Sequence, residues 1–320
     1  MEGITLGVFG TDQGAKGAFE SAVANKSEAE GIAVYTRTEG GRRYSFLDTL
    51  DFPGRIQGYS RIASMSDHAL IFFPSSGRLS PQDGELAVLL DAFRLPGAIE
   101  IFDGSVTPDR ASSSFRGTLI SSYRIDERQT GNSAINLSHS IPRNDFPNKG
   151  TIVYIDRSFS VKGVGTVALG FVLSGTVSLH DQLRLVPGPL DKRADVKGIQ
   201  VNDVDIESAG RGIRVGLSLR GVEPSDLEKT YWLDDGSFQV TDSLTLDLKK
   251  SSFYHPEVAG RDLHLQLPGE ILPASLIGSG GDLITARLPV QVPAWEGMRT
   301  CVVDLNSGTQ RVAGGATVKF

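Results

Sequence analysis

The alternation of apolar and polar positions divides the 320-residue chain into a mixed part and a strand-rich part. Up to about residue 148, short apolar runs at residues 4–9 and 69–73 alternate with stretches of helical spacing, such as residues 84–93. This order is typical of an α/β layer built on a parallel sheet. From about residue 149 the apolar positions recur with a period of two between Gly-containing turns, which predicts β-structure.

The strand-rich part is most regular between residues 150 and 240. Residues 164–171 form a period-two run between turns at Lys162-Gly163 and Ser174-Gly175. Several short strands at close spacing predict a small closed barrel. The residues expected in its core include Val153, Ile155, Phe159, Val167, Leu169, Leu183 and Val215. The residues interpreted as solvated surface include Lys162, Arg211 and Arg214.

A second all-β domain is predicted after residue 240, because residues 244–248, 263–267 and 301–305 also alternate. Neither this part nor the rest of the chain shows metal-ligand spacing of His and Cys or a Ser-His-Asp pattern. The sequence therefore assigns no catalytic residue and no metal site.

Composition limits where the protein works. Hydrophobic residues make up 39% and charged residues 22% of the chain, as in ordinary soluble proteins. No apolar run approaches the roughly 20 residues of a spanning helix, and the N-terminus does not resemble a signal peptide, so no membrane partner is expected. Because Cys301 is the only cysteine, no disulfide within the chain is possible. We expect a reducing, cytoplasmic location and no disulfide-linked partner.

The charge distribution disfavours a broad nucleic-acid surface. The net charge is −6, and the three predicted parts carry 15, 10 and 7 basic residues against 18, 12 and 8 acidic residues. Tight binding through phosphates usually requires an excess of Lys and Arg. The sequence therefore argues against a tight general RNA binder but leaves a local basic patch open.

A candidate phosphate loop follows the first predicted strand. The segment Gly10-Thr11-Asp12-Gln13-Gly14-Ala15-Lys16-Gly17 is predicted as a loop, and residues 18–26 as a helix. A phosphate loop has this context and the pattern G-x-x-x-x-G-K-[ST]. Lys16 keeps the lysine position. Ala15 adds a Cβ where the pattern has glycine, and Gly17 lacks the hydroxyl that would hold magnesium.

The first barrel resembles a known family. The order Phe159-x-Val161-x-Gly163-x-Gly165-Thr166-Val167-x-x-Gly170, followed by residues 196–200 and 209–217, resembles the second domain of the elongation factor Tu superfamily. Residues 204–209 together with 214–216 are similar to the archaeal selenocysteine-specific elongation factor branch. This archaeal-type resemblance implies a translation elongation factor of the cytoplasm that binds GTP with Mg²⁺ and acts on aminoacyl-tRNA and the ribosome.

The resemblance also implies a three-domain order. An α/β P-loop GTPase-like domain is expected at residues 1–148, a translation-factor β-barrel at residues 149–240, and a second β-barrel at residues 241–320. It implies a nucleotide site formed by Gly10, Gly14, Ala15, Lys16, Gly17, Asp48, Asp51 and Gly54. Either Asp48 or Asp51 could be the carboxylate that reaches magnesium through water.

Several family positions are altered in the first domain. Arg55 stands where the family has the histidine that orients the attacking water, and His68 is interpreted as structural. Residues 103–106 replace the Asn-Lys-x-Asp motif that selects guanine. Residues 134–137 are predicted as the last strand, and the Pro-rich link at residues 141–149 leaves no room for a closing helix. The domain is interpreted as a degenerate, inactive GTPase.

Three hypotheses follow from these observations. The first is a translation factor that acts on aminoacyl-tRNA or the ribosome with weak or lost GTP binding and hydrolysis. The second is an active GTPase switch with altered motifs, favoured by Lys16 and by the pattern from Asp51 to Gly54. The third is a nucleotide-independent scaffold for protein interactions, favoured by the combined loss of motifs.

Overall fold

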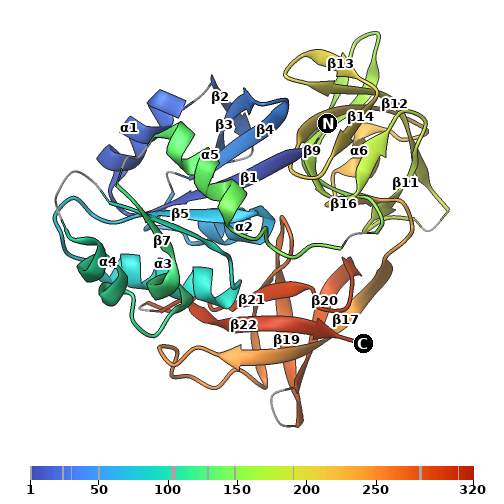
Figure 1. Cartoon of the computed structure of the whole chain (residues 1–320). Helices are drawn as coiled ribbons and strands as arrows, with labels where there is room; N and C mark the ends of the chain where they lie inside the picture. Colours follow the sequence, from blue (N-terminus) through green and yellow to red (C-terminus); the bar gives the residue numbers. More distant parts are fainter. Residues whose placement is uncertain are drawn as a thin grey trace.

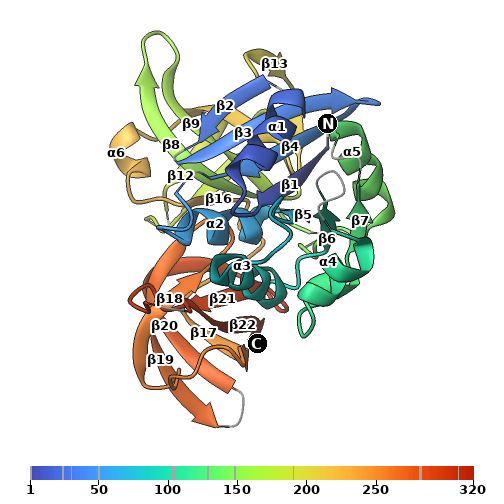
Figure 2. The same cartoon turned by 90° about the vertical axis from the view of Figure 1, so that its left-hand side faces the viewer.

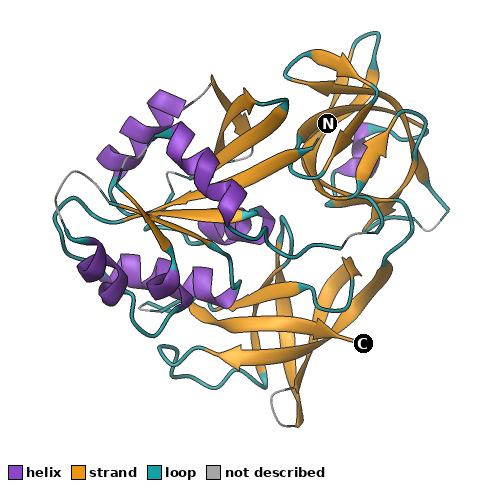
Figure 3. Cartoon of the chain, in the orientation of Figure 1, coloured by secondary structure: helices purple, strands orange, loops and turns teal. Residues whose placement is uncertain are grey.

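The chain forms an α/β domain followed by two β-barrels, as the computed structural model shows (Figures 1 and 3). This confirms the predicted fold class. The residues that the structure describes are 2–23, 25–29, 31–49, 51–101, 106–127, 130–147, 149–189, 191–280, 283–308 and 310–320. Among them, no helix has both the length and the apolar character needed to cross a membrane.

The α/β domain contains a seven-stranded sheet in the order β2-β3-β4-β1-β5-β6-β7. The strands from β4 to β7 are parallel along this order, whereas β2, β3 and β4 pair in antiparallel fashion. Its elements are β1 (Gly3–Phe9), α1 (Gln13–Val23), β2 (Asn25–Ala29), β3 (Ile32–Glu39), β4 (Arg42–Asp48), α2 (Gln57–Met65), β5 (His68–Phe72), α3 (Pro81–Ala92), β6 (Gly97–Glu100), α4 (Pro108–Ser114), the 3₁₀ helix η1 (Leu119–Ser122), β7 (Arg124–Asp126) and α5 (Gly131–Ser140).

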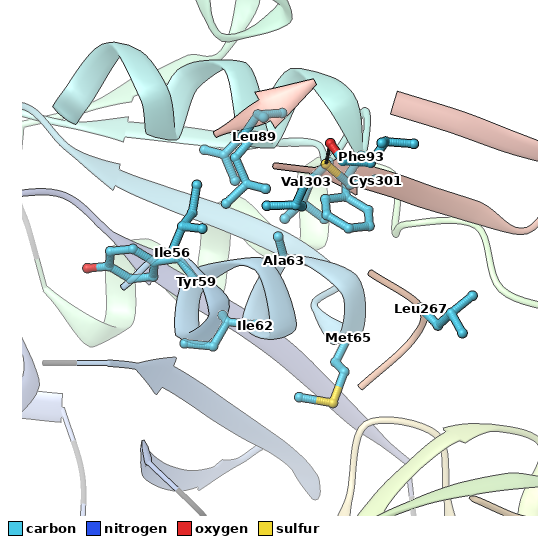
Figure 4. Packing of buried hydrophobic residues seen from close by; sticks show 14 of the residues in the cluster. Ile56, Tyr59, Ile62, Ala63, Met65, Leu89, Phe93, Leu267, Cys301 and Val303 are labelled. Carbon is cyan, nitrogen blue, oxygen red and sulfur yellow. Dashed lines mark hydrogen bonds between the residues drawn. The ribbon is translucent and has the colours of Figure 1, made fainter. Parts of the chain in front are cut away.

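Helices cover both faces of this sheet (Figure 1). Phe19 of α1 and Ile135 of α5 pack on one face with Leu6 and Phe46. On the other face, α2 and α3 lie between the sheet and the C-terminal barrel. Figure 4 shows α2 and α3 side chains beside Cys301 of that barrel, in an apolar core that continues into it. The first and third domains therefore share one hydrophobic core.

The middle domain is a barrel formed by β8 to β16. Its sheet runs β11-β16-β8-β9-β15-β12-β13, and a further β11–β12 pairing closes it. Strands β10 and β14 form a separate pair. The elements are β8 (Ile152–Val161), β9 (Gly165–Ser174), β10 (Thr176–Ser178), β11 (Gln182–Val186), β12 (Arg193–Val201), β13 (Val204–Ile206), β14 (Ser208–Gly210), β15 (Arg214–Arg220), α6 (Pro224–Leu227) and β16 (Trp232–Asp234).

The C-terminal domain is a closed barrel in the order β17-β20-β19-β18-β21-β22. It lies below the α/β domain in Figure 2, on the side of α3. The elements are β17 (Gln239–Lys250), β18 (Arg261–Gln266), β19 (Ile271–Gly280), β20 (Leu283–Ala294), β21 (Arg299–Val303) and β22 (Val312–Lys319).

Three local predictions in the first domain are wrong. Helix α1 ends at Val23 and strand β2 follows, so residues 18–26 are not one helix. Residues 134–137 are not a strand but lie in helix α5, and this helix closes the domain before the link, where no closing helix was expected. Helix α5 begins with a reciprocal capping box between Thr130 and Ser133, and buries Ala134 and Ile135. Capping and packing therefore outweigh the modest helix propensity of a segment rich in Ser and Asn.

The inward face of the middle barrel also differs from the prediction. Thr166 and Ala168 of β9 are buried, while Val167 and Leu169 are only half-buried. The pairing of β8 with β9 shifts register between Ile155 and Arg157. Beyond this irregularity the two strands extend past the barrel (Figure 2). The Phe159 side chain is consequently 37% exposed rather than part of the core.

Arg211 and Arg214, predicted as solvated, form ion pairs instead. Arg214 donates two hydrogen bonds of 3.1 Å to Asp156 within the barrel. Arg211 donates to Asp67 of the first domain, whose carboxylate also accepts from Arg143 at 2.9 Å. Asp67 thereby links the first domain to the middle barrel. Lys162 is exposed, as predicted.

Candidate nucleotide site

The candidate phosphate loop is shorter than predicted. Helix α1 begins at Gln13, so Gly14, Ala15, Lys16 and Gly17 all lie in its first turns, and the loop prediction for these residues is wrong. Gly10, with φ of 146°, and the two residues after it connect β1 to the helix. A phosphate loop needs a longer turn whose amides curl around the ligand. That turn is absent between residues 10 and 17.

The N-terminus of α1 is already occupied by a carboxylate of the chain. Asp12 Oδ1 accepts from the backbone N–H of Ala15 at 3.0 Å, in the position of an N-cap. Asp12 Oδ2 accepts from the backbone N–H and the hydroxyl of Ser75, at 3.0 and 2.5 Å. Burial raises the pKa of Asp12, but these hydrogen bonds together lower it by more. The pKa of Asp12 is therefore below its usual value. A fixed anion therefore stands where a helix N-terminus would otherwise attract phosphate.

Lys16 points into the protein and uses all its donors there. Its Nζ donates to both carboxylate oxygens of Asp48, each at 2.8 Å, and to the Tyr59 hydroxyl at 2.6 Å. The side chain of Lys16 is fully buried and that of Asp48 is 1% exposed. A lysine ammonium has three N–H donors, and these three contacts account for them. In this arrangement Lys16 has no donor left for a terminal phosphate.

Tyr59 connects this ion pair to the loop. Its hydroxyl lies 3.1 Å from the Gly10 carbonyl oxygen and 3.0 Å from Asp48 Oδ1, and can donate to either acceptor. Burial, followed by the charge of Asp48, raises the pKa of Tyr59 well above its usual value. Tyr59 therefore stays neutral and holds the loop and the ion pair together.

Glu20 is a further buried carboxyl group beside the pair, one turn beyond Lys16 on α1. Burial is the main cause that raises the pKa of Glu20 to about 8, with the neighbouring Asp48 carboxylate adding to it. A hydrogen bond from Tyr35 and the charge of Lys16 act in the opposite direction. Near neutral pH the group is therefore mostly protonated, which avoids two adjacent buried anions.

The structure separates the two candidate magnesium carboxylates. Asp48 is buried against Lys16 at the end of β4, whereas Asp51 is exposed on the turn that leads to Gly54. Among the described residues, no three His, Cys, Asp or Glu side chains are grouped to hold a metal ion. Gly17, on the helix, has no hydroxyl to contribute. As arranged here, these residues do not fit GTP with Mg²⁺.

The turn from Asp51 to Gly54 is held by the C-terminal barrel. Arg311 donates to the carbonyl oxygens of Pro53 at 3.0 Å and Gly54 at 3.1 Å. The same guanidinium forms a bidentate pair with Glu85 of α3, at 3.0 and 2.6 Å. Arg311 therefore clamps the Asp51–Gly54 turn onto the third domain.

The remaining predicted positions lie apart from this cluster. His68 is at the start of β5, and its Nε2 lies 3.1 Å from the Ile141 carbonyl oxygen. His68 lies at the start of β5, whereas Asp48 lies at the end of β4 in the same parallel sheet and Lys16 lies on α1 after the end of β1. His68 is therefore not placed to orient a water beside the Lys16–Asp48 pair. Burial lowers the pKa of His68. Residues 103–105, where guanine selectivity was predicted to be lost, lie outside the described residues.

Sequence reasoning found Lys16 and Asp48 but did not predict that they pair, and it missed Asp12, Tyr59 and Arg311. Asp12 carried a usable signal, because an Asp directly before a helix is a common N-cap. Tyr59 and Arg311 carried none, since Tyr59 is 43 residues from Lys16 and Arg311 is 226 or more residues from Glu85 and from the Asp51–Gly54 turn.

Fold and site together define a three-domain protein in which an α/β domain with a buried Lys16–Asp48 pair precedes two β-barrels. Residues 165–233 match the family model for elongation factor Tu domain 2. An uncharacterized protein of Methanocaldococcus jannaschii is 30% identical over 261 residues, which cover 81% of this chain and 80% of that protein. The selenocysteine-specific elongation factor of the same archaeon is 33% identical over 126 residues, covering 38% of this chain and 26% of that protein.

Solved structures with a similar fold include members of the same group of translation factors. The apo form of the translation elongation factor SelB from Methanococcus maripaludis has a TM-score of 0.78 at 20% identity, covering 100% of this chain and 80% of that chain. That factor has also been solved in complex with the GTP analogue GPPNHP. The chain belongs to the family of elongation factor Tu- and SelB-like translation factors.

Proposed function

We propose that this protein acts in translation, on aminoacyl-tRNA or the ribosome, without using GTP as a switch. The observation that carries the proposal is the buried ion pair of Lys16 with Asp48. A lysine that binds phosphate must be able to reach its ligand, and here each N–H of Lys16 already has a partner inside the protein. The Asp12 carboxylate at the N-terminus of α1 repels a second anion at the same place.

The fixed turn at Asp51–Gly54 supports the same proposal. Switch segments work by being ordered in one nucleotide state and released in the other. In this chain Arg311 ties the turn to the C-terminal barrel through bonds that require no nucleotide. The three domains then keep one arrangement, which is compatible with constitutive binding of a translation partner.

Isothermal titration of GTP and GDP, each with magnesium, tests the nucleotide part of the proposal. We expect no binding tighter than about 1 mM with the full chain. The Lys16→Ala variant, checked for folding by circular dichroism, serves as the control for heat from nonspecific binding. Micromolar binding that disappears in Lys16→Ala would overturn this part and support an active GTPase switch, which turnover of GTP with and without ribosomes would then measure.

The translation part needs a separate measurement. Co-sedimentation with ribosomes and gel-shift with aminoacylated and deacylated tRNA at physiological salt should detect selective association. If neither particle is bound, the translation role fails. The nucleotide-independent scaffold then becomes the better hypothesis, since the cross-domain bonds of Arg211 and Arg311 hold the domains rigidly for such a role.

A further inference from the structure

A second polar site lies away from the altered nucleotide site, between the first and third domains. It is a cleft of about 760 Å³ bordered by the C-terminal end of α3, the segment before η1 and the outer face of the barrel. Ligand sites in proteins commonly have volumes of about 300–1,000 Å³. The cleft is therefore large enough to hold a nucleotide unit.

The floor of the cleft is built by neighbouring strands of the barrel. Outward-facing Lys249 of β17 pairs with Gly315 of β22, and Asp247 with Thr317. A Cβ on Gly315 would lie 2.2 Å from the Ala92 carbonyl oxygen, so the missing side chain lets α3 approach the sheet. This close approach forms one wall of the cleft and places the end of α3 near the lysines at the end of β17.

Positive charge is concentrated at this place. Residues 241–320 contain seven Lys and Arg and eight Asp and Glu. Four of those seven cations line the cleft, but Asp247 is the one acid of that segment among the described lining residues. The first domain adds Arg94 and Asp91, so the lining carries a net charge of about +3. The cleft is thus a local basic patch in a chain of net charge −6.

Several of these cations are available to a ligand. Lys249 is exposed and forms no ion pair with any residue that the structure describes. Lys319 lies 3.5 Å from Glu296, but both groups are about half exposed, and such pairs contribute little. Arg299 differs, because it donates to the carbonyl oxygens of Phe93 and Arg94 at the end of α3 and is structural.

An exposed aromatic ring completes the lining. Phe253 follows β17 and its side chain is 54% exposed. Its backbone is fixed, since its N–H donates to Ser251 Oγ at 3.2 Å and the next residue, Tyr254, is buried and bonded to Asp304 at 2.7 Å. An exposed aromatic ring on a fixed backbone near lysines is an arrangement that proteins use to stack a nucleic-acid base.

We propose that this cleft binds a single-stranded segment of RNA. Lys249, Lys319 and Arg94 contact successive phosphates, and Phe253 stacks on one base. The cations stand on both sides of the cleft, from two domains, which suits an extended chain of phosphates more than one small anion. The proposal rests on the cleft itself and is independent of the proposed loss of GTP binding.

Fluorescence anisotropy with a labelled single-stranded RNA of 12 nucleotides tests the proposal on the full chain. Lys249→Glu should weaken binding at least about tenfold, and lower the steepness of the log-log salt dependence by about 0.7 for each phosphate that the variant no longer neutralises. Phe253→Ala should weaken binding about fivefold or more, because the base no longer has a ring to stack on. Circular dichroism and melting should show that both variants fold as the wild type does, because both side chains are exposed.

Matched controls lie elsewhere on the same barrel. Arg287→Glu makes the same charge reversal on exposed β20, and Leu283→Ala removes an apolar side chain that is 42% exposed. Neither should change RNA binding more than about twofold. Equal weakening by Lys249→Glu and Arg287→Glu would mean a diffuse charge effect and overturn the proposal.

Competition with a mononucleotide identifies the source of the phosphate. Uridine monophosphate should displace the labelled RNA only at concentrations far above those of unlabelled 12-mer. Displacement at comparable concentrations would assign the cleft to free nucleotides and overturn RNA binding. Absence of RNA binding by the wild-type protein would do the same, while leaving the ribosome and GTP measurements unaffected.

Discussion

Lys16 and Lys249 are the same residue type but have different roles in this molecule. Lys16 occupies the sequence position of a phosphate-binding lysine, yet it is fully buried and held by Asp48 and Tyr59. Lys249 belongs to no recognised motif, yet it is exposed in a cleft that carries excess positive charge. Motif position alone therefore does not identify the available cation. Availability depends on which carboxylates the fold brings to it.

The sharpest way to break this comparison is to remove Lys16. Lys16→Met leaves the Asp48 carboxylate buried without its partner, and we expect the free energy of unfolding to fall by about 3–5 kcal/mol. Urea denaturation followed by circular dichroism measures the loss. The double variant Lys16→Met/Asp48→Asn should recover part of it, because the uncompensated charge is gone. A loss below about 1 kcal/mol in Lys16→Met would contradict the structural role.

The clamp of Arg311 should be the next largest contribution. Arg311→Ala removes a bidentate pair from Glu85, whose side chain is 4% exposed, and two bonds to the Asp51–Gly54 turn. We expect a loss of about 2–3 kcal/mol, with a smaller loss in Arg311→Lys, which keeps the charge but not the planar fork. Hydrogen exchange should show faster exchange of the Arg55 amide, which donates to the Asp51 carbonyl oxygen. Unchanged exchange in Arg311→Ala would refute the clamp.

The sequence predicted those parts of the fold that depend on contacts between residues close together in the chain. The barrels were predictable because period-two alternation and glycine turns are local signals. The inward face of β9 was not, since the small Thr166 and Ala168 face the core while Val167 and Leu169 are only half-buried. The extra residue of β8 between Ile155 and Arg157 likewise changes which β8 positions, Phe159 among them, face the core. Helix α5 was missed because its capping box and packing outweigh a weak propensity.

At the candidate site, too, local sequence signals were predictable and contacts between distant residues were not. Lys16 was found from its neighbours in sequence, but its burial depends on Asp48 and Tyr59, which are 32 and 43 residues away. A single sequence without the fold does not bring them together. Asp12 lies within the loop itself, and its role as an N-cap could have been predicted once the start of α1 was placed correctly.

Glu20 provides a pH-dependent test of the crowded carboxylates near Lys16. Its pKa is raised to about 8 in the folded protein, from a usual value near 4.5. Between these values the folded state holds a proton that the unfolded state has lost, so stability should fall as pH rises from about 5 to 8. Glu20→Gln has no such proton and should show a flatter decline of melting temperature over this range. Parallel profiles for both proteins would refute the raised pKa.

The smallest expected effect on stability concerns Lys249, the exposed lysine of the comparison with Lys16. Lys249→Met should change the free energy of unfolding by no more than about 0.5 kcal/mol, because the lysine is exposed and forms no ion pair with a described residue. The same urea titration used for Lys16→Met measures it. A loss above about 1 kcal/mol would show that Lys249 is structural, like Lys16, and that the cleft has no spare cation there. Near-zero change, combined with weaker RNA binding, would separate the two lysines: one keeps the fold together and the other contacts a partner.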